Sequence, residues 1–366
     1  MTAPALGGVT IVDFSRVLAG PYATMLLGDF GARVVKVERP GVGDETRAWA
    51  PPVDSRGMST YFASVNRNKE SVALDLATEE GRAAALDLIR EADVVVENFR
   101  AGTMGRLGLG YETVAELNPR VVYCSITGFG AGEGAAQPGF DLLVQAVGGL
   151  MSITGQRPGE PTKTGVALVD VLTGLHAVTG ILTALVSRAS TGRGQRVEVN
   201  LLSSLLSGLV NQAGAHLGAG AVPGILGNAH PSIAPYEVFE ASDRPLVVAA
   251  GTDAQFRAFA AAIGAPELLA DKRLRTNAGR VEHRQHLARV ASERLATRTA
   301  EEWTTLLTAA DVPAGPVNTI PEAFALAERL GLAPVAEVGG SRSVANPVTL
   351  SATPAEYRLP PPALPA

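Results

Sequence analysis

The chain has 366 residues, of which 46% are hydrophobic and 18% charged, and its formal net charge is −5. This is the composition of an ordinary globular protein, and its length suits two domains or one large α/β unit with an appendage. The acidic balance and the lack of a long basic run disfavour nucleic acid and anionic membrane surfaces as partners. Cys124 is the sole cysteine, which excludes an intramolecular disulfide and a thiolate zinc site.

The first half of the chain alternates apolar runs with helical patterns. Apolar runs that are typical of buried strands occupy residues 8–14, 33–38, 71–76, 93–98 and 120–126. Helical patterns occupy 21–32, 78–93 and the region near 111–118, and a turn leads into a further strand at 190–200. Continuous apolar strands separated by helices indicate a parallel sheet that is covered on both faces. We therefore expect an α/β, Rossmann-like, doubly wound large domain over residues 1–200, with ligands at the carboxyl ends of its strands.

The second half has a different texture. Residues 201–227 are rich in Leu, Gly and Ala without a sharp period, and we interpret them as a linker or as a helix that runs into a linker. Residues 228–325 contain two short strand patterns and then amphipathic helices, which indicates a smaller α+β domain. Residues 326–366 end in LPPPALPA and are expected to return to the large domain as an extended segment.

Familiar signatures of enzyme sites are missing. The turn after the first strand, SRVLAGPYAT, is neither a G-x-G-x-x-G nor a P-loop motif, so a nicotinamide-dependent dehydrogenase is disfavoured. Metal-ligand spacing among the histidines is limited to His283 and His286, on a charged helix whose exposed face explains them better, so no metal is expected. The start MTAPALGG lacks the features of a signal peptide, and the apolar segments around 165–187 and 201–223 are interrupted by polar residues and glycines. We expect a cytoplasmic protein that does not span a membrane.

The order of several motifs is more informative than any one of them. The stretches VDFSRVLAGPYATMLLGDFGARVVKVERPGVGDETR, SVNRNKESVALDL, ADVVVENFRAG, SITGFG, PGFDLLVQAVGGLM and STGRGQRVEV occur in this order. With the ALVD–TG segment, LGNAHPSIAPYEVF and VPAGPVNTIPEAF, they resemble the class III CoA-transferase family, which includes formyl-CoA transferases and α-methylacyl-CoA racemases. The resemblance implies a CoA-transferase with acyl-CoA and carboxylic acids as substrates, no tightly bound cofactor, and an interlocked homodimer.

Asp170 stands at the predicted start of the apolar helix in GVALVDVLTGLHAVTGILTALVSR. Taken alone, an aspartate at this place is interpreted as a helix N-cap. The resemblance implies instead that Asp170 is the nucleophile, forming a mixed anhydride with the acyl group and then an aspartyl-CoA thioester. We expect backbone N–H groups at the start of the same helix to stabilise the oxyanions.

The resemblance also implies a CoA site. CoA carries several phosphate charges, which call for Arg and Lys, and an adenine, which calls for apolar packing. The implied CoA-binding residues are Val17, Leu18, Ala19, Arg39, Lys69, Asn98, Phe99 and Arg106.

The triplet Gly139-Phe140-Asp141 bears on the reaction type. The racemases of the family have a histidine at the middle position, and Phe140 cannot carry a proton, which favours CoA transfer over racemisation. The LGNAHPSIAPYEVF stretch resembles the branch that uses dicarboxylic acids such as succinyl-CoA and glutarate. The candidate substrate-binding residues are Arg16, Arg47, Phe140, Asn228 and His230. A 2-methylacyl-CoA racemase and a non-catalytic CoA-binding protein remain as alternatives.

Overall fold

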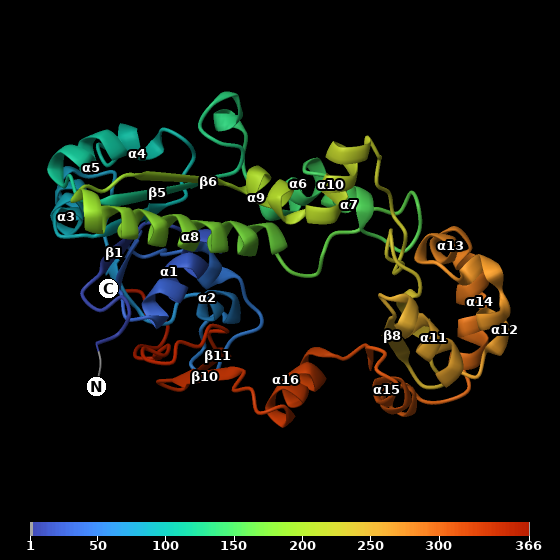
Figure 1. Ribbon diagram of the computed structural model, residues 1–366. Coiled ribbons are helices and arrows are strands. Elements are labelled where there is room, and N and C mark those ends of the chain that lie inside the picture. The colour runs from blue at the N-terminus through green and yellow to red at the C-terminus, as the bar shows by residue number, and fades with distance from the viewer. Residues whose placement is uncertain (1–2, 366) are drawn as a thin grey trace. The chain divides into compact units, whose positions relative to one another are not determined.

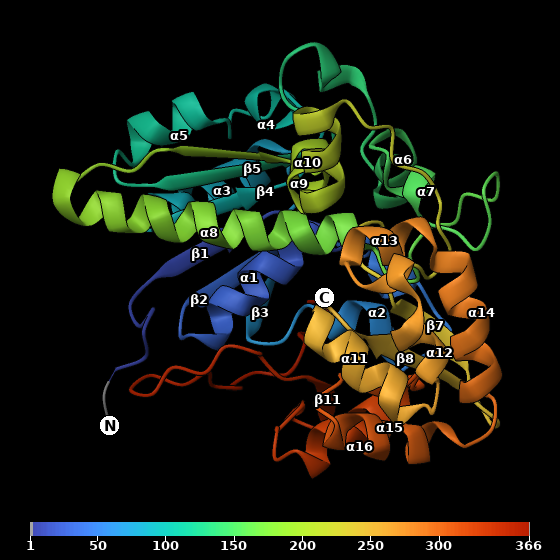
Figure 2. The same ribbon diagram turned by 45° about the vertical axis from the view of Figure 1, so that its right-hand side comes forward.

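The computed structural model describes residues 3–365, which divide into two compact units (Figures 1 and 2). The first unit contains the chain up to Leu150, Lys163–Val222 and the segment from Gly331 onward. The second unit contains Met151–Thr162 and Pro223–Leu330. The unit limits differ from those expected, because 151–162 joins the second unit and that unit continues to 330.

A six-stranded, wholly parallel sheet forms the first unit, with strand order β3-β2-β1-β4-β5-β6. The strands are β1 (Thr10–Asp13), β2 (Arg33–Glu38), β3 (Lys69–Ala73), β4 (Val94–Glu97), β5 (Val122–Thr127) and β6 (Arg196–Asn200). This order is that of a doubly wound Rossmann-like sheet, so the predicted fold class is confirmed. The chain reverses its direction of winding between β1 and β4, and a crevice opens at such a point.

Helices cover both faces of the sheet, as the apolar strands require. One face packs on α1 (Ala19–Asp29) and α8 (Leu168–Thr191), which lie side by side in Figures 1 and 2. The other packs on α3 (Glu79–Arg90), α4 (Thr103–Arg106) and α5 (Tyr111–Leu117). Side chains alternate between the faces, so Ile11 joins the first core and Val12 the second. Cys124 is fully buried in the first core, as its apolar strand predicts.

Helix α8 is long and apolar enough to span a membrane by length and composition, with a window of mean hydropathy 1.7. Core helices of α/β proteins meet the same criteria, and α8 packs here against the sheet and α1. Gly174 permits this packing, because a Cβ there would lie 2.7 Å from the Ala19 carbonyl oxygen. The close approach places the second turn of α8 against the first turn of α1.

Residues 201–219 are helical, as in the alternative of a helix that runs into a linker. They form α9 (Leu201–Gly208) and α10 (Val210–Ala219), and the Asn200 side chain caps α9 by accepting the Ser203 N–H. Leu201 and Leu205 are buried in the core beside α8, which gives these Leu-rich residues a packing role. The shorter helices of this unit are α2 (Thr60–Ser64), α6 (Asp141–Val147) and the 3₁₀ turns Glu45–Ala48 and Glu133–Ala136. Helix α7 (Leu150–Ile153) begins at Leu150 of this unit, and its other residues belong to the second unit.

The C-terminal segment begins with the hairpin of β10 (Val335–Val338) and β11 (Ser341–Val344) and continues without regular structure. A buried cluster holds it at the amino edge of the sheet, where α1 ends and β3 begins. Arg67 pairs with Asp29 at 2.6 Å and donates to the Val344 carbonyl, while Asn68 accepts from Arg358 and Leu359 backbone N–H groups. We call Asp29, Arg67, Asn68 and Arg358 the amino-edge network.

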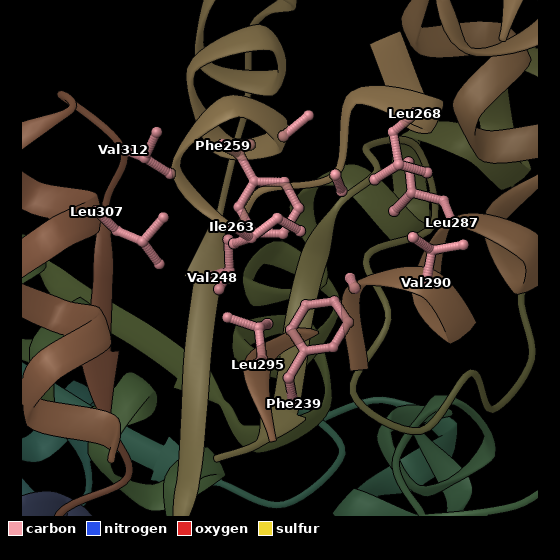
Figure 3. Close-up of a cluster of buried hydrophobic side chains, with 14 of the residues drawn as sticks. Phe239, Val248, Phe259, Ile263, Leu268, Leu287, Val290, Leu295, Leu307 and Val312 are labelled. Carbon is pink, nitrogen blue, oxygen red and sulfur yellow. The ribbon is translucent and has the colours of Figure 1, made fainter. Parts of the chain in front are cut away.

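The second unit contains a three-stranded antiparallel sheet in the order β7 (Tyr236–Glu240), β8 (Pro245–Ala249) and β9 (Ala314–Pro316). Its helices are α11 (Asp253–Ala262), α12 (Pro266–Ala270), the 3₁₀ turn Lys272–Leu274, α13 (Asn277–Glu282), α14 (Arg284–Leu295), α15 (Ala300–Ala309) and α16 (Ile320–Arg329). Figure 3 shows the core, in which Phe259 and Ile263 lie beside Val248. This is the smaller α+β unit that the sequence predicts.

Candidate active site

A cavity of about 570 Å³ lies at the carboxyl edge of the parallel sheet, where the winding reverses. It is lined by the turn after β1, the turn after β4, the end of β5, and the starts of α6 and α8. This is the place where ligands bind in doubly wound sheets. The sequence-predicted residues that line it are Arg16, Val17, Leu18, Ala19, Asn98, Phe99, Phe140 and Asp170.

The turn after β1 is fixed by the turn after β4. The Asn98 side chain accepts the Arg16 backbone N–H and donates to the Arg16 carbonyl, both at 2.8 Å. The Arg16 guanidinium lies 4.7 Å from the centre of the Phe99 ring, a cation–π contact. Glu97, just before them, accepts the Phe99 N–H, and burial raises the pKa of its carboxyl above the ordinary value. Asn98 therefore acts on the cavity by holding Arg16.

Below this turn lies a cluster of fully buried charges, which we call the carboxyl-edge network: Asp13, Lys36, Asp44 and Lys69. Lys69 Nζ contacts Asp13 at 3.1 Å and Lys36 Nζ contacts Asp44 at 3.0 Å. Two carboxylates and two ammonium groups thus compensate one another out of water, as buried charges require.

Lys69 was expected to bind CoA, and the structure corrects this. Its ammonium group donates to Asp13, to the Pro21 carbonyl and to Asn66, which uses all three of its donors inside the protein. Burial lowers the pKa of Lys69 to about 8 even though Asp13 opposes the shift. A lysine in this position supports the start of α1 and has no donor left for a phosphate.

Asp170 lies in the first turn of α8 but does not cap it, which corrects the N-cap interpretation. The helix begins at Leu168, and the Asp141 side chain accepts the backbone N–H groups of Val169 at 2.8 Å and Asp170 at 3.3 Å. Asp141 is held in turn by the buried side chain of Gln145 at 2.6 Å. The N–H groups expected to stabilise an oxyanion are therefore already engaged by a carboxylate.

The electrostatics of Asp170 differ from those of an ordinary surface aspartate. Burial, followed by the nearby charge of Asp141, raises the pKa of Asp170 to about 7. Within residues 3–365, no donor forms a hydrogen bond with the Asp170 carboxylate, which faces the cavity. Burial and the Asp170 charge also raise the pKa of Tyr61, whose ring meets Trp49 edge-on at 5.0 Å. A carboxylate without hydrogen bonds keeps its lone pairs available for reaction.

The approach of α6 to Asp170 depends on a crossing of two glycines. A Cβ on Gly139 would lie 2.5 Å from the Gly128 Cα, so neither position tolerates a side chain. Phe140 follows directly, lines the cavity and is 64% exposed.

Three further predicted arginines lie outside this cavity. Arg47 donates to both carboxylate oxygens of Glu38 and to the Pro362 carbonyl, so three of its five N–H donors are engaged within the protein. Arg39 is exposed and lines a separate cavity of about 190 Å³ that shares Arg16 and Phe99 with the larger one. Arg106 is exposed on α4 and donates to Thr103.

Asn228 and His230 belong to the second unit and are described within it. His230 Nδ1 accepts the Ser232 N–H at 3.1 Å, and its ring lies 5.1 Å from that of Tyr236. Among residues 3–365, no group of three or more His, Cys, Asp or Glu side chains could hold a metal ion.

Sequence reasoning missed several residues that line the large cavity. Glu45 and Trp49 come from the segment after β2, where no motif singled them out. Arg100 lies three residues after the end of β4, and Thr127 ends β5, so the carboxyl-end rule would have found them. Arg100 adds a second exposed cation to the cavity beside Arg16.

Comparisons with known proteins agree with this architecture. Residues 6–366 match CoA-transferase family III. The chain is 41% identical to the succinate–glutarate CoA-transferase of Agrobacterium fabrum, over 99% of this chain and 93% of that protein. It is 44% identical to the succinyl-CoA:mesaconate CoA-transferase of Haloarcula hispanica, over 87% and 82% of the two chains.

A solved structure supports the same assignment. The crystal structure of a CaiB/BaiF family protein from Brucella suis superposes with a TM-score of 0.90 at 39% identity, covering 99% of this chain and 97% of that one. The chain therefore belongs to CoA-transferase family III.

Proposed function

We propose that this CoA-transferase moves CoA from a dicarboxylic acyl-CoA, such as succinyl-CoA, to a second dicarboxylic acid through covalent intermediates on Asp170. The observation that carries the proposal is the Asp170 carboxylate, which faces the cavity at the winding reversal without a hydrogen-bond donor among residues 3–365. A pKa raised to about 7 makes its carboxylate more nucleophilic while keeping a substantial ionised fraction at neutral pH.

The transfer proceeds in four balanced steps. The Asp170 carboxylate attacks the thioester carbonyl, the C–S bond breaks, and CoA thiolate leaves behind a mixed anhydride. The thiolate then attacks the Asp170 carbonyl, which releases the first acid and forms an aspartyl-CoA thioester. The second acid attacks this thioester to form a new anhydride, and the thiolate attacks the acyl carbonyl of that anhydride, so that Asp170 is regenerated.

The start of α1 is the best source of donors for the oxyanions. The N–H groups of α8 are occupied by Asp141. In the described part of the chain, the backbone N–H groups of Leu18, Ala19 and Gly20 have no acceptor, and Leu18 and Ala19 line the cavity. Unoccupied N–H groups at a helix start favour developing negative charge.

The two neighbouring cavities suit the two ends of acyl-CoA. The larger holds the thioester near Asp170, and the smaller, lined by Val37, Arg39, Leu74 and Leu76, suits the adenine. Arg16 and Phe99 line both, which makes a continuous path. Arg39 and Arg100 are exposed along it and can meet the phosphates.

A dicarboxylic substrate needs a cation for its second carboxylate. Arg16 suits this role because it lines the large cavity and its ion pair with Glu45 is long, at 3.6 Å, and partly exposed. The names of the two relatives include succinate, glutarate and mesaconate, all dicarboxylates. We keep Asn228 and His230 as proposed substrate contacts.

Racemisation has less support. A two-base racemase requires a second proton-carrying group, and the described residues that line the cavity include no histidine. A non-catalytic CoA-binding protein would not need an unpaired carboxylate in the cavity. We also propose a homodimer, since α8 and α10 expose large apolar side chains, among them Leu175, Val186, Val210 and Leu217.

The test is to trap the enzyme-bound intermediate. After incubation with succinyl-CoA and quenching with hydroxylamine, mass spectrometry should find a hydroxamate on the peptide that contains Asp170. The Asp170→Asn variant is the matched control and should give none. CoA exchange between succinyl-CoA and glutarate that survives in this variant would contradict the mechanism, and α-deuteration of a 2-methylacyl-CoA in D₂O without an acceptor acid would favour racemisation.

A further inference from the structure

Val17, in the turn that lines the large cavity, has a backbone conformation that valine rarely adopts. Its φ is +67°, in the left-handed region, where a β-branched side chain is strained. Glycine or asparagine would adopt this conformation at lower cost. Such strain persists only where the surroundings enforce it.

The group that enforces it is Asp44. The Val17 N–H points at the Asp44 carboxylate, 3.3 Å from Oδ1 and 3.2 Å from Oδ2. Asp44 is 1% exposed and is itself fixed, because Oδ1 accepts the N–H and the hydroxyl of Thr46 while Oδ2 accepts Lys36 Nζ. Lys36 also donates to the Ser15 carbonyl at 2.8 Å, so the Lys36–Asp44 ion pair binds the turn on both sides of Arg16.

Every group within hydrogen-bond distance of the Asp44 carboxylate is a donor. Lys36 and the Thr46 hydrogen bonds outweigh the effect of burial and hold the pKa of Asp44 below its ordinary value. An amide in its place would offer one acceptor where two are used, and its NH₂ group would face other donors. The Asp44 carboxylate thus matches its surroundings in its negative charge and in its number of hydrogen-bond acceptors.

We propose that Asp44 is a positioning residue for acyl-CoA binding, which holds Val17 in the strained turn that shapes the cavity. This rests on the proposed function, in which acyl-CoA occupies the cavity. Asp44 itself does not line the cavity, so it acts through the turn.

The experiment compares Asp44→Asn with Asp29→Asn. Both substitutions remove one charge from a fully buried ion pair, but Asp29 belongs to the amino-edge network. Asp44→Asn should raise the KM for succinyl-CoA about tenfold, the effect of one charged hydrogen bond, with kcat changed less than about threefold. Asp29→Asn should lower thermal stability and leave KM unchanged. An unchanged KM in Asp44→Asn, or an equal rise in both variants, overturns the proposal.

A double-mutant cycle with Val17→Gly tests the role of strain. Glycine adopts a φ near +67° without the penalty of valine, so adding Asp44→Asn to the Val17→Gly variant should raise KM by about threefold or less. If Asp44→Asn raises KM equally in the wild-type chain and in the Val17→Gly variant, Asp44 does not act by enforcing this conformation.

Two measurements keep the proposal testable if a variant or the assay fails. Thr46→Ala removes one hydroxyl donor from Asp44 without an unpaired charge and should raise KM by about two- to fourfold, so no rise counts against the proposal. Amide hydrogen exchange of residues 14–22 should be faster in Asp44→Asn, or in Thr46→Ala if the former does not fold, than in Asp29→Asn. This readout needs no turnover, so it separates failure of the positioning role from failure of the proposed function.

Discussion

The two buried charge networks adjoin in the chain, where Asn68 is followed by Lys69, but they hold different segments. Both the amino-edge and the carboxyl-edge networks contain ion pairs at 1% exposure or less. The amino-edge network joins the C-terminal segment to the end of α1, and its left-handed residue is Asn68, a type that tolerates this conformation. The carboxyl-edge network instead holds Val17, which does not. The strained residue that is ill-suited to its conformation therefore belongs to the turn that lines the candidate site.

The largest expected effect is the loss of activity in Asp170→Asn, at the carboxyl edge. We expect the rate of CoA transfer to fall by at least about 10⁴-fold, because Asp170 is the proposed nucleophile and no other described residue of α8 brings a carboxylate to the cavity. The Asp170→Asn protein should be more stable than wild type. The pKa of Asp170 goes from 3.8 to about 7 on folding, so wild type loses stability as pH rises through this window. Urea unfolding at neutral pH should show a gain of about 1–3 kcal/mol. A loss of stability in Asp170→Asn would contradict this account.

The counterpart at the amino edge is Arg67→Met. This change leaves Asp29 buried without its ionic partner and should cost about 3–5 kcal/mol of unfolding free energy. The KM and kcat of the protein that remains folded should equal those of wild type. Limited proteolysis should cleave the segment after 344 earlier, because Arg67 holds the Val344 carbonyl. A changed KM in Arg67→Met would contradict the expectation that the amino-edge network does not affect acyl-CoA binding.

The pH dependence sharpens the role of Asp141 near the carboxyl edge. Because the nucleophile is the ionised form, kcat/KM for acyl-CoA should rise with pH up to about 7 and then level off. In Asp141→Asn the neighbouring charge is gone, so the midpoint should move to lower pH even if the maximum rate falls. Gln145→Ala is the control, since it loosens Asp141 but keeps its charge. The same midpoint in Asp141→Asn and wild type would exclude charge coupling.

The smallest expected effects compare the two ends of α8. Gly192 ends the helix with φ +72°, so Gly192→Ala should cost about 1 kcal/mol of stability and leave activity unchanged. At the other end, Gly174→Ala pushes against the Ala19 carbonyl and should reduce kcat/KM as well as stability. Equal activity in both variants would mean that α8 and the α1 turn are not coupled.

Much of the first unit was predictable from local sequence pattern. Its strands are short apolar runs, and α3, within the helical pattern at 78–93, is capped by Thr78, which accepts the Gly81 N–H. The sequence left open whether 201–227 is a linker throughout or begins as a helix, because its Leu-rich residues lack a sharp period and only the packing of Leu201 and Leu205 beside α8 shows their role. The burial of Lys36 and Lys69 could not be predicted either, because their partners Asp44 and Asp13 lie eight and 56 residues away along the chain.

The candidate site was predictable in its residues more than in their connections. The resemblance placed Asp170, Asn98 and the turn after β1 together, and the cavity contains them. It did not reveal that Asp141 occupies the N–H groups of α8, 28 residues away, since this contact depends on how α6 meets α8. Nor did it reveal that Glu38, nine residues earlier, binds the Arg47 guanidinium.

The cap of α8 has a consequence for how this enzyme can be tuned. Since Asp141 belongs to α6 and not to α8, the acidity of Asp170, the proposed nucleophile, depends on a segment other than the helix that carries it. A small displacement of α6 would alter the distance between two negative charges and so convert movement into a change of proton affinity. Substitutions around Gly128 and Gly139 would then adjust reactivity without touching the reacting residue.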